Sequence, residues 1–456
     1  MRYAISEIPL IKRVLKSRWP QWSIVAVMLF FFVLAIIAGL FGTPAGNRNF
    51  GIVFVWIVWW ALLILLLVPF AGRLWCGVCP IPAPGEWLQR RALVRPRPGG
   101  KLYTLGKKWP RAFRNIWLQN AGFLAVALFS AVILTTPIVT ALLLLGFMLV
   151  AVGTSLVFER RTFCRYLCPV GGFIGLYSQV APIELRVKDP AVCAGHKEKL
   201  CYTGSDDGYG CPWLVFPGSL TSNTYCGLCT ECLKTCNQDN IAIFVRWPGA
   251  DLLKTTGHRV DEAYKGLIML ACALLYSAVL IGPWGVLKET ARAVGTPGWF
   301  VYAGVFLALN LAILPGLFWL AVRSGQSLGK PVANAKTTTG TLFGDYAAVL
   351  VPLGLTAWVA FSLSFVLVNF SYAWPALSDP MGWGWNLLGT AGMPWTPYVP
   401  GLVPVLQTPV LLIGLAVAVA LALRTARQHG QSPRGALPVV AFCAVVTIGL
   451  LGLYLA

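Results

Sequence analysis

Residues 51–80 read GIVFVWIVWWALLILLLVPFAGRLWCGVCP, an apolar run that leads directly into two cysteines and a proline. The apolar part has about the 20 residues that a helix needs to cross the roughly 30 Å hydrocarbon core of a bilayer. Cys76 and Cys79 follow at the point where such a helix would leave the membrane. The stretch therefore predicts a membrane-spanning helix that carries thiols to the membrane surface.

The whole chain has the composition of a membrane protein. Its 456 residues are 57% hydrophobic and 11% charged, with a mean hydropathy of +0.71. We expect an all-α polytopic membrane protein of about nine transmembrane helices with a small cytoplasmic ferredoxin-like α+β insert. The expected domains are a four-helix membrane core over 1–158, a cytoplasmic cysteine-rich domain over 159–264 and a five-helix membrane domain over 265–456. The apolar stretches cover residues 22–42, 51–71, 117–135, 138–158, 265–286, 298–322, 344–369, 406–424 and 436–455.

Basic residues gather on one side of these stretches. If the N-terminus is cytoplasmic, only Arg48, Lys288 and Arg292 of the 36 Lys and Arg residues fall outside the cytoplasmic segments. The positive-inside rule then predicts a cytoplasmic N-terminus and a periplasmic C-terminus in a bacterial inner membrane. The net charge of +20 faces anionic lipid in this orientation, so it indicates no nucleic-acid partner.

The cysteines fall on the same predicted side as the basic residues. All 13 except Cys272 and Cys443 lie between Cys76 and Cys236, in segments assigned to the reducing cytoplasm. That compartment disfavours disulfides, so metal binding or redox chemistry is expected. The two exceptions stand alone in apolar stretches, where a buried cysteine acts as a small hydrophobic residue.

The strongest motif is the ferredoxin run, residues 226–236, with the spacing C-x2-C-x2-C-x3-C. In bacterial ferredoxins this spacing wraps three thiolates around one [4Fe–4S] cluster, while the fourth reaches a second cluster. Zinc is the alternative, but zinc sites favour two separated ligand pairs. Asn237 stands where a ferredoxin has proline. The expected iron ligands of the run are Cys226, Cys229, Cys232 and Cys236.

A second, stretched set of cysteines precedes the run. By the crossover rule, Cys211, which precedes a proline, completes the cluster of the first three cysteines of the run. Cys236 then joins Cys193 and Cys201, and this second cluster is one ligand short. His196 is one candidate for the missing ligand. A cysteine from elsewhere in the chain and a three-iron cluster are the alternatives.

Two similar motifs follow two predicted helix hairpins. Residues 73–80 read RLWCGVCP and residues 161–169 read RTFCRYLCP. This parallel duplication predicts that the thiols of both motifs meet at the membrane surface and hold a further cluster. A redox dithiol pair and a copper site are the alternatives. We call the four thiols the paired-motif quartet: Cys76, Cys79, Cys164 and Cys168.

Together, these motifs resemble the membrane-bound polyferredoxin family. The family includes the quinol dehydrogenase membrane subunit of periplasmic nitrate reductase, the membrane half of the nitrous oxide reductase maturation flavoprotein and the cytochrome oxidase accessory ferredoxin. The resemblance covers roughly residues 51–245 and implies [4Fe–4S] clusters that exchange electrons with the quinone pool or a redox partner. The stretched segment 193–213 and the five C-terminal spans depart from the family, which indicates a divergent branch.

The predicted function is electron transfer between a cytoplasmic redox partner and quinone or a membrane oxidoreductase partner. Two to three iron–sulfur clusters, mainly [4Fe–4S], are the expected cofactors, with quinone as a further candidate. The partners expected are a cytoplasmic redox protein or oxidoreductase subunit, the quinone pool, membrane lipid and other membrane subunits. The chain would be a quinone-linked oxidoreductase or its electron-transfer subunit. The alternatives are a membrane copper reductase or assembly factor using the Cys-Pro motifs, and a zinc-stabilised anchor.

Haem and quinone need different residues, and the sequence can be searched for each. None of the three histidines, His196, His258 and His429, lies in a predicted span, so haem b is not expected. A quinone site needs an apolar cleft with groups that bind carbonyl oxygens or move protons. Glu86, Glu159 and His258 are candidates for those groups, although interfacial residues of these types are common.

Overall fold

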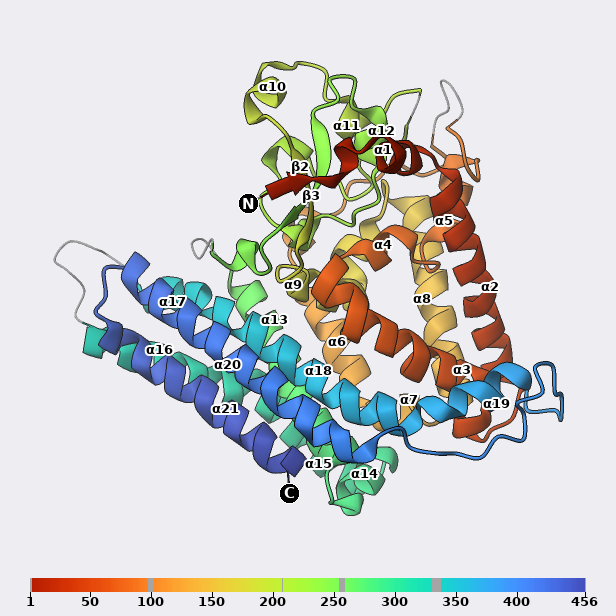
Figure 1. Cartoon of the computed structure of the whole chain (residues 1–456), viewed down its shortest axis with the longest axis vertical. Helices are drawn as coiled ribbons and strands as arrows, with labels where there is room; N and C mark the ends of the chain where they lie inside the picture. Colours follow the sequence, from red (N-terminus) through yellow and green to blue (C-terminus); the bar gives the residue numbers. More distant parts are fainter. Residues whose placement is uncertain (1, 97–101, 207, 254–258, 330–337, 456) are drawn as a thin grey trace. The chain divides into compact units, whose positions relative to one another are not determined.

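The computed structural model describes residues 2–96, 102–206, 208–253, 259–329 and 338–455. The chain forms two compact units, each built from several segments (Figure 1). The cysteine-bearing unit comprises Met1–Leu40, Leu66–Gln119 and Thr140–Asp251. The C-terminal unit comprises Phe41–Leu65, Asn120–Val139 and Leu252–Ala456. The domain boundaries expected from the sequence stay a prediction.

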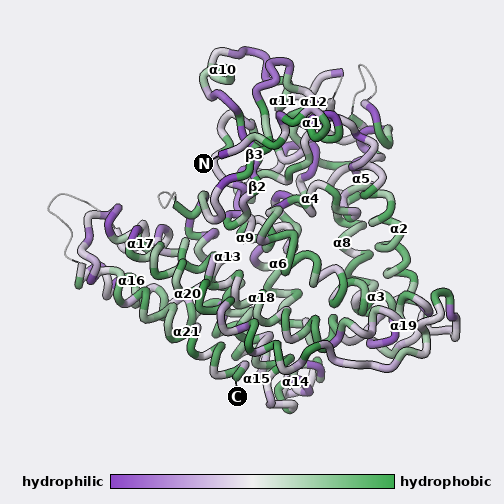
Figure 2. Tube along the Cα trace, viewed as in Figure 1, coloured by the Kyte–Doolittle hydropathy of each residue, from purple (hydrophilic) through white to green (hydrophobic). Residues whose placement is uncertain are grey.

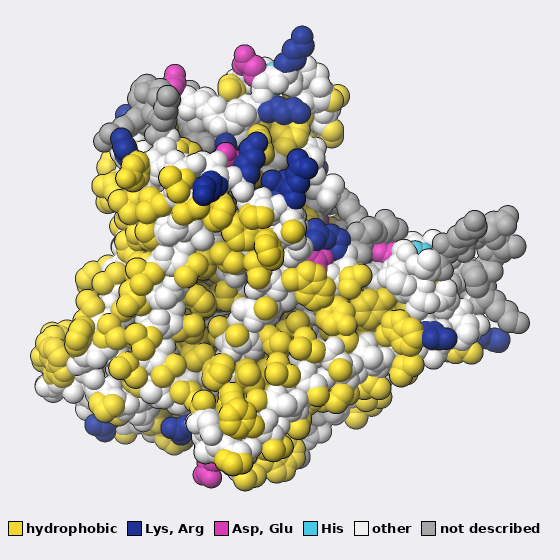
Figure 3. Space-filling model, turned by 180° about the vertical axis from the view of Figure 1, so that it is seen from behind, with side chains coloured by type: hydrophobic (Ala, Val, Ile, Leu, Met, Phe, Trp, Pro, Cys, Tyr) yellow, Lys and Arg dark blue, Asp and Glu magenta, His cyan; other side chains and the backbone are white. Residues whose placement is uncertain are grey.

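Most of the described chain is helical, and much of its helical surface is apolar (Figures 2 and 3). Among the described residues, eight helices are long and apolar enough to cross a membrane. They are Trp19–Phe41, Phe50–Ala71, Pro137–Val157, Val260–Ile281, Pro297–Gly329, Thr339–Ser378, Pro400–Gln428 and Pro433–Leu455.

The ninth expected span, 117–135, is not one long helix. Helix α6 (Trp117–Leu128) ends before Phe129, and the short helix α7 (Ser130–Ile133) follows. The stretch then stops at Thr135 and Thr136, because a residue that precedes proline is disfavoured in helical conformation and Pro137 comes next. An apolar composition alone does not reveal these interruptions.

A three-stranded antiparallel sheet lies in the cysteine-bearing unit. Its order is β1 (Arg2–Ala4), β3 (Ile241–Arg246) and β2 (Ile183–Val187). The N-terminal residues therefore join the expected insert, which the sequence did not indicate. Buried Leu185 and Ile243 face each other in the register and pack with residues of the ferredoxin run, so the sheet supports the cysteine loops. The likeness of this segment to a ferredoxin stays a prediction.

Short helices of the same unit carry or flank the cysteines. The longer apolar helices α2 and α8 belong mainly to this unit as well. The helices are α1 (Pro9–Lys16), α2 (Trp19–Phe41), α4 (Leu74–Val78), α5 (Ala83–Arg90), α8 (Pro137–Val157), α9 (Pro169–Tyr177), α10 (Pro190–Gly195), α11 (Leu200–Thr203) and α12 (Glu231–Thr235).

The C-terminal unit is a bundle in which α18 packs on α13 and α20, and α20 packs on α21 (Figure 1). Trp358 lies at its core, where its indole donates to the Met269 carbonyl at 3.0 Å and its ring meets Tyr276 edge to face. Cys272 is buried here and contacts the Asn310 side chain. Its main helices are α3 (Phe50–Ile52), α13 (Val260–Tyr276), α14 (Gly285–Arg292), α15 (Pro297–Ala308), α16 (Leu314–Gly329), α17 (Thr339–Tyr346), α18 (Leu350–Asn369), α19 (Ala373–Ser378), α20 (Val403–Gln428) and α21 (Leu437–Leu455).

Candidate functional site

The two Cys-Pro motifs adopt related but different local structures. The first cysteine of motif one lies on α4, and Cys79 follows the helix in extended conformation. Motif two has one more residue between its cysteines, and a π-helical turn over Phe163–Leu167 accommodates it. Cys168 then caps α9, and its Sγ accepts the Gly171 N–H at 3.2 Å.

The structure brings the paired-motif quartet together. The pKa of Cys168 is raised to about 12, mainly by burial, and the neighbouring Cys76 contributes to the rise. Burial and the other three thiols of the quartet likewise raise the pKa of Cys164, so the four lie close enough to interact electrostatically. Cys79, Cys164 and Cys168 are therefore protonated on their own. A bound metal centre would deprotonate them.

Two buried arginines join the elements around this quartet. Arg161 donates to the Cys76 carbonyl at 2.6 Å and to Glu86 Oε2 at 2.9 Å. Arg73 donates to the Gly171 carbonyl at 3.0 Å and also to the Thr224 carbonyl. The first position of each motif is therefore a structural cation that ties one Cys-Pro segment to another part of the unit.

The pairing of Arg161 changes the interpretation of Glu86. Burial alone would raise the pKa of this carboxyl, but Arg161 and Arg90 outweigh it and lower the pKa below its usual value. Glu86 is thus held as a buried carboxylate. It is a poor proton carrier for quinone. Of the other two candidates, Glu159 is half-buried just after α8, and His258 lies outside the described residues.

A second set of four thiols surrounds one cavity, which is also lined by Leu185, Trp213 and Leu220. Burial is the main cause that raises the pKa of Cys226 to about 11 and the pKa of Cys229 to about 12. Neighbouring Cys211 contributes to both shifts, which is the grouping that the crossover rule predicts. We call this set the ferredoxin-run quartet: Cys211, Cys226, Cys229 and Cys232.

The backbone of the ferredoxin run turns its N–H groups toward these sulfurs. Leu228 and Thr230 have positive φ angles of 50° and 58°, which non-glycine residues seldom adopt. Backbone hydrogen bonds from Leu228 to Cys226 and from Glu231 to Cys229 lower the pKa of each thiol against the effect of burial. The loop is therefore shaped to stabilise thiolates, as ligands of a cluster require.

The remaining three cysteines line a separate cavity together with His196 and Asn240. Asn240 is buried, and its side chain donates to Cys193 Sγ at 3.3 Å. Its backbone N–H donates to Cys236 Sγ at 3.4 Å. Burial and the neighbouring thiols raise the pKa of Cys201 to about 11. We call this set the trio: Cys193, Cys201 and Cys236.

The three sets of thiols are contiguous. A Cβ atom on Gly77, between the cysteines of motif one, would lie 3.0 Å from the Gly227 carbonyl and 3.4 Å from the Leu228 carbonyl. The backbone of motif one is therefore in contact with the backbone of the ferredoxin run, between the two quartets. Cys201 of the trio interacts electrostatically with Cys211 on the other side. The ferredoxin-run quartet consequently lies between the other two sets.

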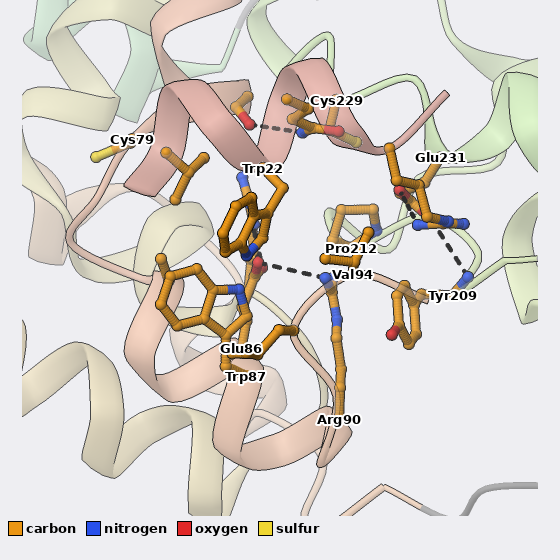
Figure 4. Close-up of a pocket in the computed structure, with 17 residues that line it drawn as sticks. Trp22, Cys79, Glu86, Trp87, Arg90, Val94, Tyr209, Pro212, Cys229 and Glu231 are labelled. Carbon is orange, nitrogen blue, oxygen red and sulfur yellow. Dashed lines mark hydrogen bonds and ion pairs between the residues drawn. The ribbon is translucent and has the colours of Figure 1, made fainter. Parts of the chain in front are cut away.

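A polar pocket opens beside the first contact, lined by both Cys79 and Cys229 (Figure 4). Arg18 pairs with Glu231 at 2.7 Å on one wall. The Trp22 indole N–H and the Tyr209 hydroxyl are buried without a hydrogen-bond partner. The sequence interpretation missed this pocket, and the only local signal is the acidic Glu231 inside the ferredoxin run.

All cysteine positions expected to bind iron thus fall into three groups, and every cysteine of the chain is a free thiol. Within the described ranges, no three His, Cys, Asp or Glu side chains stand in the arrangement that holds a single metal ion. The ferredoxin-run quartet and the trio each line a cavity of their own. Soft thiolates in sets of four are the donors that iron–sulfur cubes use, and the donor set fits that cofactor. Which of these cysteines bind iron stays a prediction.

Comparison with known proteins points to the same chemistry. A family described as a 4Fe-4S binding domain matches residues 52–101 and 140–188, and each segment contains one Cys-Pro motif. An uncharacterized protein of Methanocaldococcus jannaschii is 24% identical over 198 residues, which is 40% of this chain and 76% of that protein. No solved structure matches the chain. The family match supports an iron–sulfur protein, and the long apolar helices indicate a membrane protein.

Proposed function

We propose that this chain transfers electrons between a cytoplasmic redox partner and quinone or a membrane oxidoreductase partner. When bound, iron–sulfur clusters accept and release single electrons. The observation that carries the proposal is the contiguity of three thiol sets, with the paired-motif quartet following apolar helices at one end. A zinc-stabilised anchor does not require three sets of thiols in a row, each in contact with the next.

The protein's own residues would hold and insulate the clusters. The paired-motif quartet and the ferredoxin-run quartet each supply four thiolates, and the trio supplies three. Buried apolar side chains such as Leu185 and Trp213 exclude water from the central site. Arg73 and Arg161 fix the Cys-Pro segments by binding backbone carbonyls, which keeps the thiols in place in both redox states.

The outer end of the row suits an acidic partner. Lys197 and Lys199 are exposed beside the trio, and the exposed Arg13 lies on α1 of the same unit. Clustered positive charge speeds the encounter with a negatively charged redox protein and makes the rate depend on ionic strength. We expect association to slow as salt is added.

The polar pocket beside Cys79 is the place that best suits a quinone head group. Quinone carbonyls need hydrogen-bond donors, and the Trp22 N–H and Tyr209 O–H are buried donors without partners. The pocket also reaches Cys229, so a head group there would stand close to two thiol sets. Replacing Trp22 with Phe is expected to weaken quinone binding without changing the iron content.

Anaerobic purification followed by iron, zinc, copper and acid-labile sulfide analysis tests the proposal. We expect a brown protein with about twelve iron atoms per chain, the number that three cubes contain. Cys76→Ser or Cys164→Ser should remove one electron paramagnetic resonance signal and leave the others, with Cys272→Ser as the matched control. A colourless zinc protein would refute the proposal. Copper bound at the Cys-Pro motifs would instead favour a copper reductase or assembly factor.

A further inference from the structure

The trio lacks a fourth thiol in the structure. A [4Fe–4S] cluster uses four protein ligands, and the cavity of the trio contains only three cysteines. The paired-motif cysteines interact with one another, and Cys211 belongs to the ferredoxin-run quartet. A cysteine borrowed from another motif is therefore not the fourth ligand in this arrangement. The side chains lining the cavity that carry other iron-binding donors include His196 and Glu198.

We propose that His196 is the fourth ligand, so that the trio and one imidazole nitrogen hold a [4Fe–4S] cluster. The inference rests on the proposed function, because it requires iron at the trio. His196 follows Cys193 by three residues, which is one helical turn, and it immediately follows the end of α10. Cys193 within α10 and His196 at its C-cap both line this one cavity.

Asn240 holds α10 in the position that this ligation needs. Its amide donates to Cys193 Sγ at 3.3 Å and to the Asp189 carbonyl, just before α10, at 2.7 Å. Asp189 in turn caps the helix by accepting the Ala191 N–H at 2.8 Å. The helix is thus fixed to the strand that follows Cys236. His196 lines the cavity from the C-cap position of this supported helix.

Donor chemistry favours His196 over Glu198. Imidazole replaces thiolate as an iron ligand in known iron–sulfur proteins, where it raises the reduction potential because it is neutral. A carboxylate is a harder donor that suits magnesium, calcium and manganese better. Glu198 is also exposed, whereas His196 is half-buried at the edge of the cavity. The outer cluster would therefore carry one negative charge less than an all-cysteine cluster.

Three variants and one labelled sample test the assignment. In the wild-type protein grown with 15N-histidine, electron–nuclear double resonance is expected to show coupling between one reduced cluster and nitrogen. His196→Ala should lose about one iron atom per chain and give a three-iron signal. His196→Cys should keep its iron and show a lower reduction potential for one cluster. Glu198→Gln, the matched control, should change neither the iron content nor the potentials.

The outcomes separate this inference from the proposed function. Wild-type protein without iron would overturn both. Iron in the wild type, with no nitrogen coupling and an unchanged His196→Ala spectrum, would overturn only the histidine ligand. Iron loss in Glu198→Gln would assign the position to the carboxylate and overturn the inference as well. If His196→Ala does not fold, the nitrogen coupling of the labelled wild type decides the question by its presence or absence.

Discussion

Replacing Arg161 with Gln is expected to destabilise the cysteine-bearing unit strongly. The arginine and its partner Glu86 are both buried, at 7% and 5% exposure. Removing one member of a buried ion pair leaves an uncompensated charge and costs about 3–5 kcal/mol. Arg90 remains 3.6 Å from Glu86, so we expect the lower end of that range, about 3 kcal/mol. The loss of the hydrogen bond to the Cys76 carbonyl acts in the same direction.

The pH dependence identifies the cause of this loss. In the wild type the pKa of Glu86 is lowered, so the ion pair contributes stability above the usual carboxyl pKa of 4.5 and loses it as the pH falls further. Without Arg161, burial raises the pKa of Glu86. Protonation of Glu86 at acidic pH then removes the unpaired buried charge, and the variant regains part of its lost stability. The difference from wild type should therefore shrink as the pH falls.

Denaturant unfolding of the purified protein in detergent, followed by tryptophan fluorescence between pH 5 and 8, measures the effect. Arg13→Gln, which removes an exposed arginine of the same unit, is the matched control and should stay within about 0.5 kcal/mol of wild type. The double variant Glu86→Gln with Arg161→Gln should recover part of the loss, because no buried charge is left alone. An Arg161→Gln protein as stable as the control, or a double variant no better than the single one, would contradict the reasoning.

Three further substitutions test two of the thiol sets and a cysteine that is expected not to bind iron. Gly227→Ala would place a methyl group on the Trp213 indole, so we expect loss of the central cluster signal, whereas Gly146→Ala, which meets open space, should leave it intact. Asn240→Leu removes a donor to a sulfur of the trio and should lower the reduction potential of one cluster in a redox titration. Cys272→Ala should keep the full iron content and cost about 1–3 kcal/mol by creating a small cavity in the C-terminal unit.

Most of what could be predicted from the sequence came from the spacing of cysteines within short motifs. The ferredoxin run and the two Cys-Pro motifs are short patterns in which a few residues fix the direction of each thiol, so their grouping followed from rules of spacing and repetition. Cys211 lies with the ferredoxin run as those rules predict, and Cys201 lies with Cys236. Hydropathy likewise identified the long apolar helices, because a run of about 20 apolar residues is itself the signal.

Long-range contacts could not be predicted in this way. The close approach of Gly77 to Gly227 joins segments 150 residues apart, and no local pattern around either glycine indicates that the two segments meet. The N-terminal strand has three residues, which is too short for an alternating pattern to show. The break between α6 and α7 also left no sign, because the residues on both sides are equally apolar.

The two glycines explain why the order of the thiol sets is a property of the fold rather than of the spacing. Motif one and the ferredoxin run each place a glycine directly after their first cysteine, at Cys76-Gly77 and Cys226-Gly227. A side chain at Gly77 would press on the backbone of the ferredoxin run, and one at Gly227 would press on Trp213. Gly77 therefore allows motif one to touch the ferredoxin run, and Gly227 allows that run to pack on Trp213. Rates of electron exchange fall with separation, so in the proposed function this contact would allow clusters at the paired-motif quartet and the ferredoxin-run quartet to exchange electrons as neighbours, with the trio beyond them at the outer end.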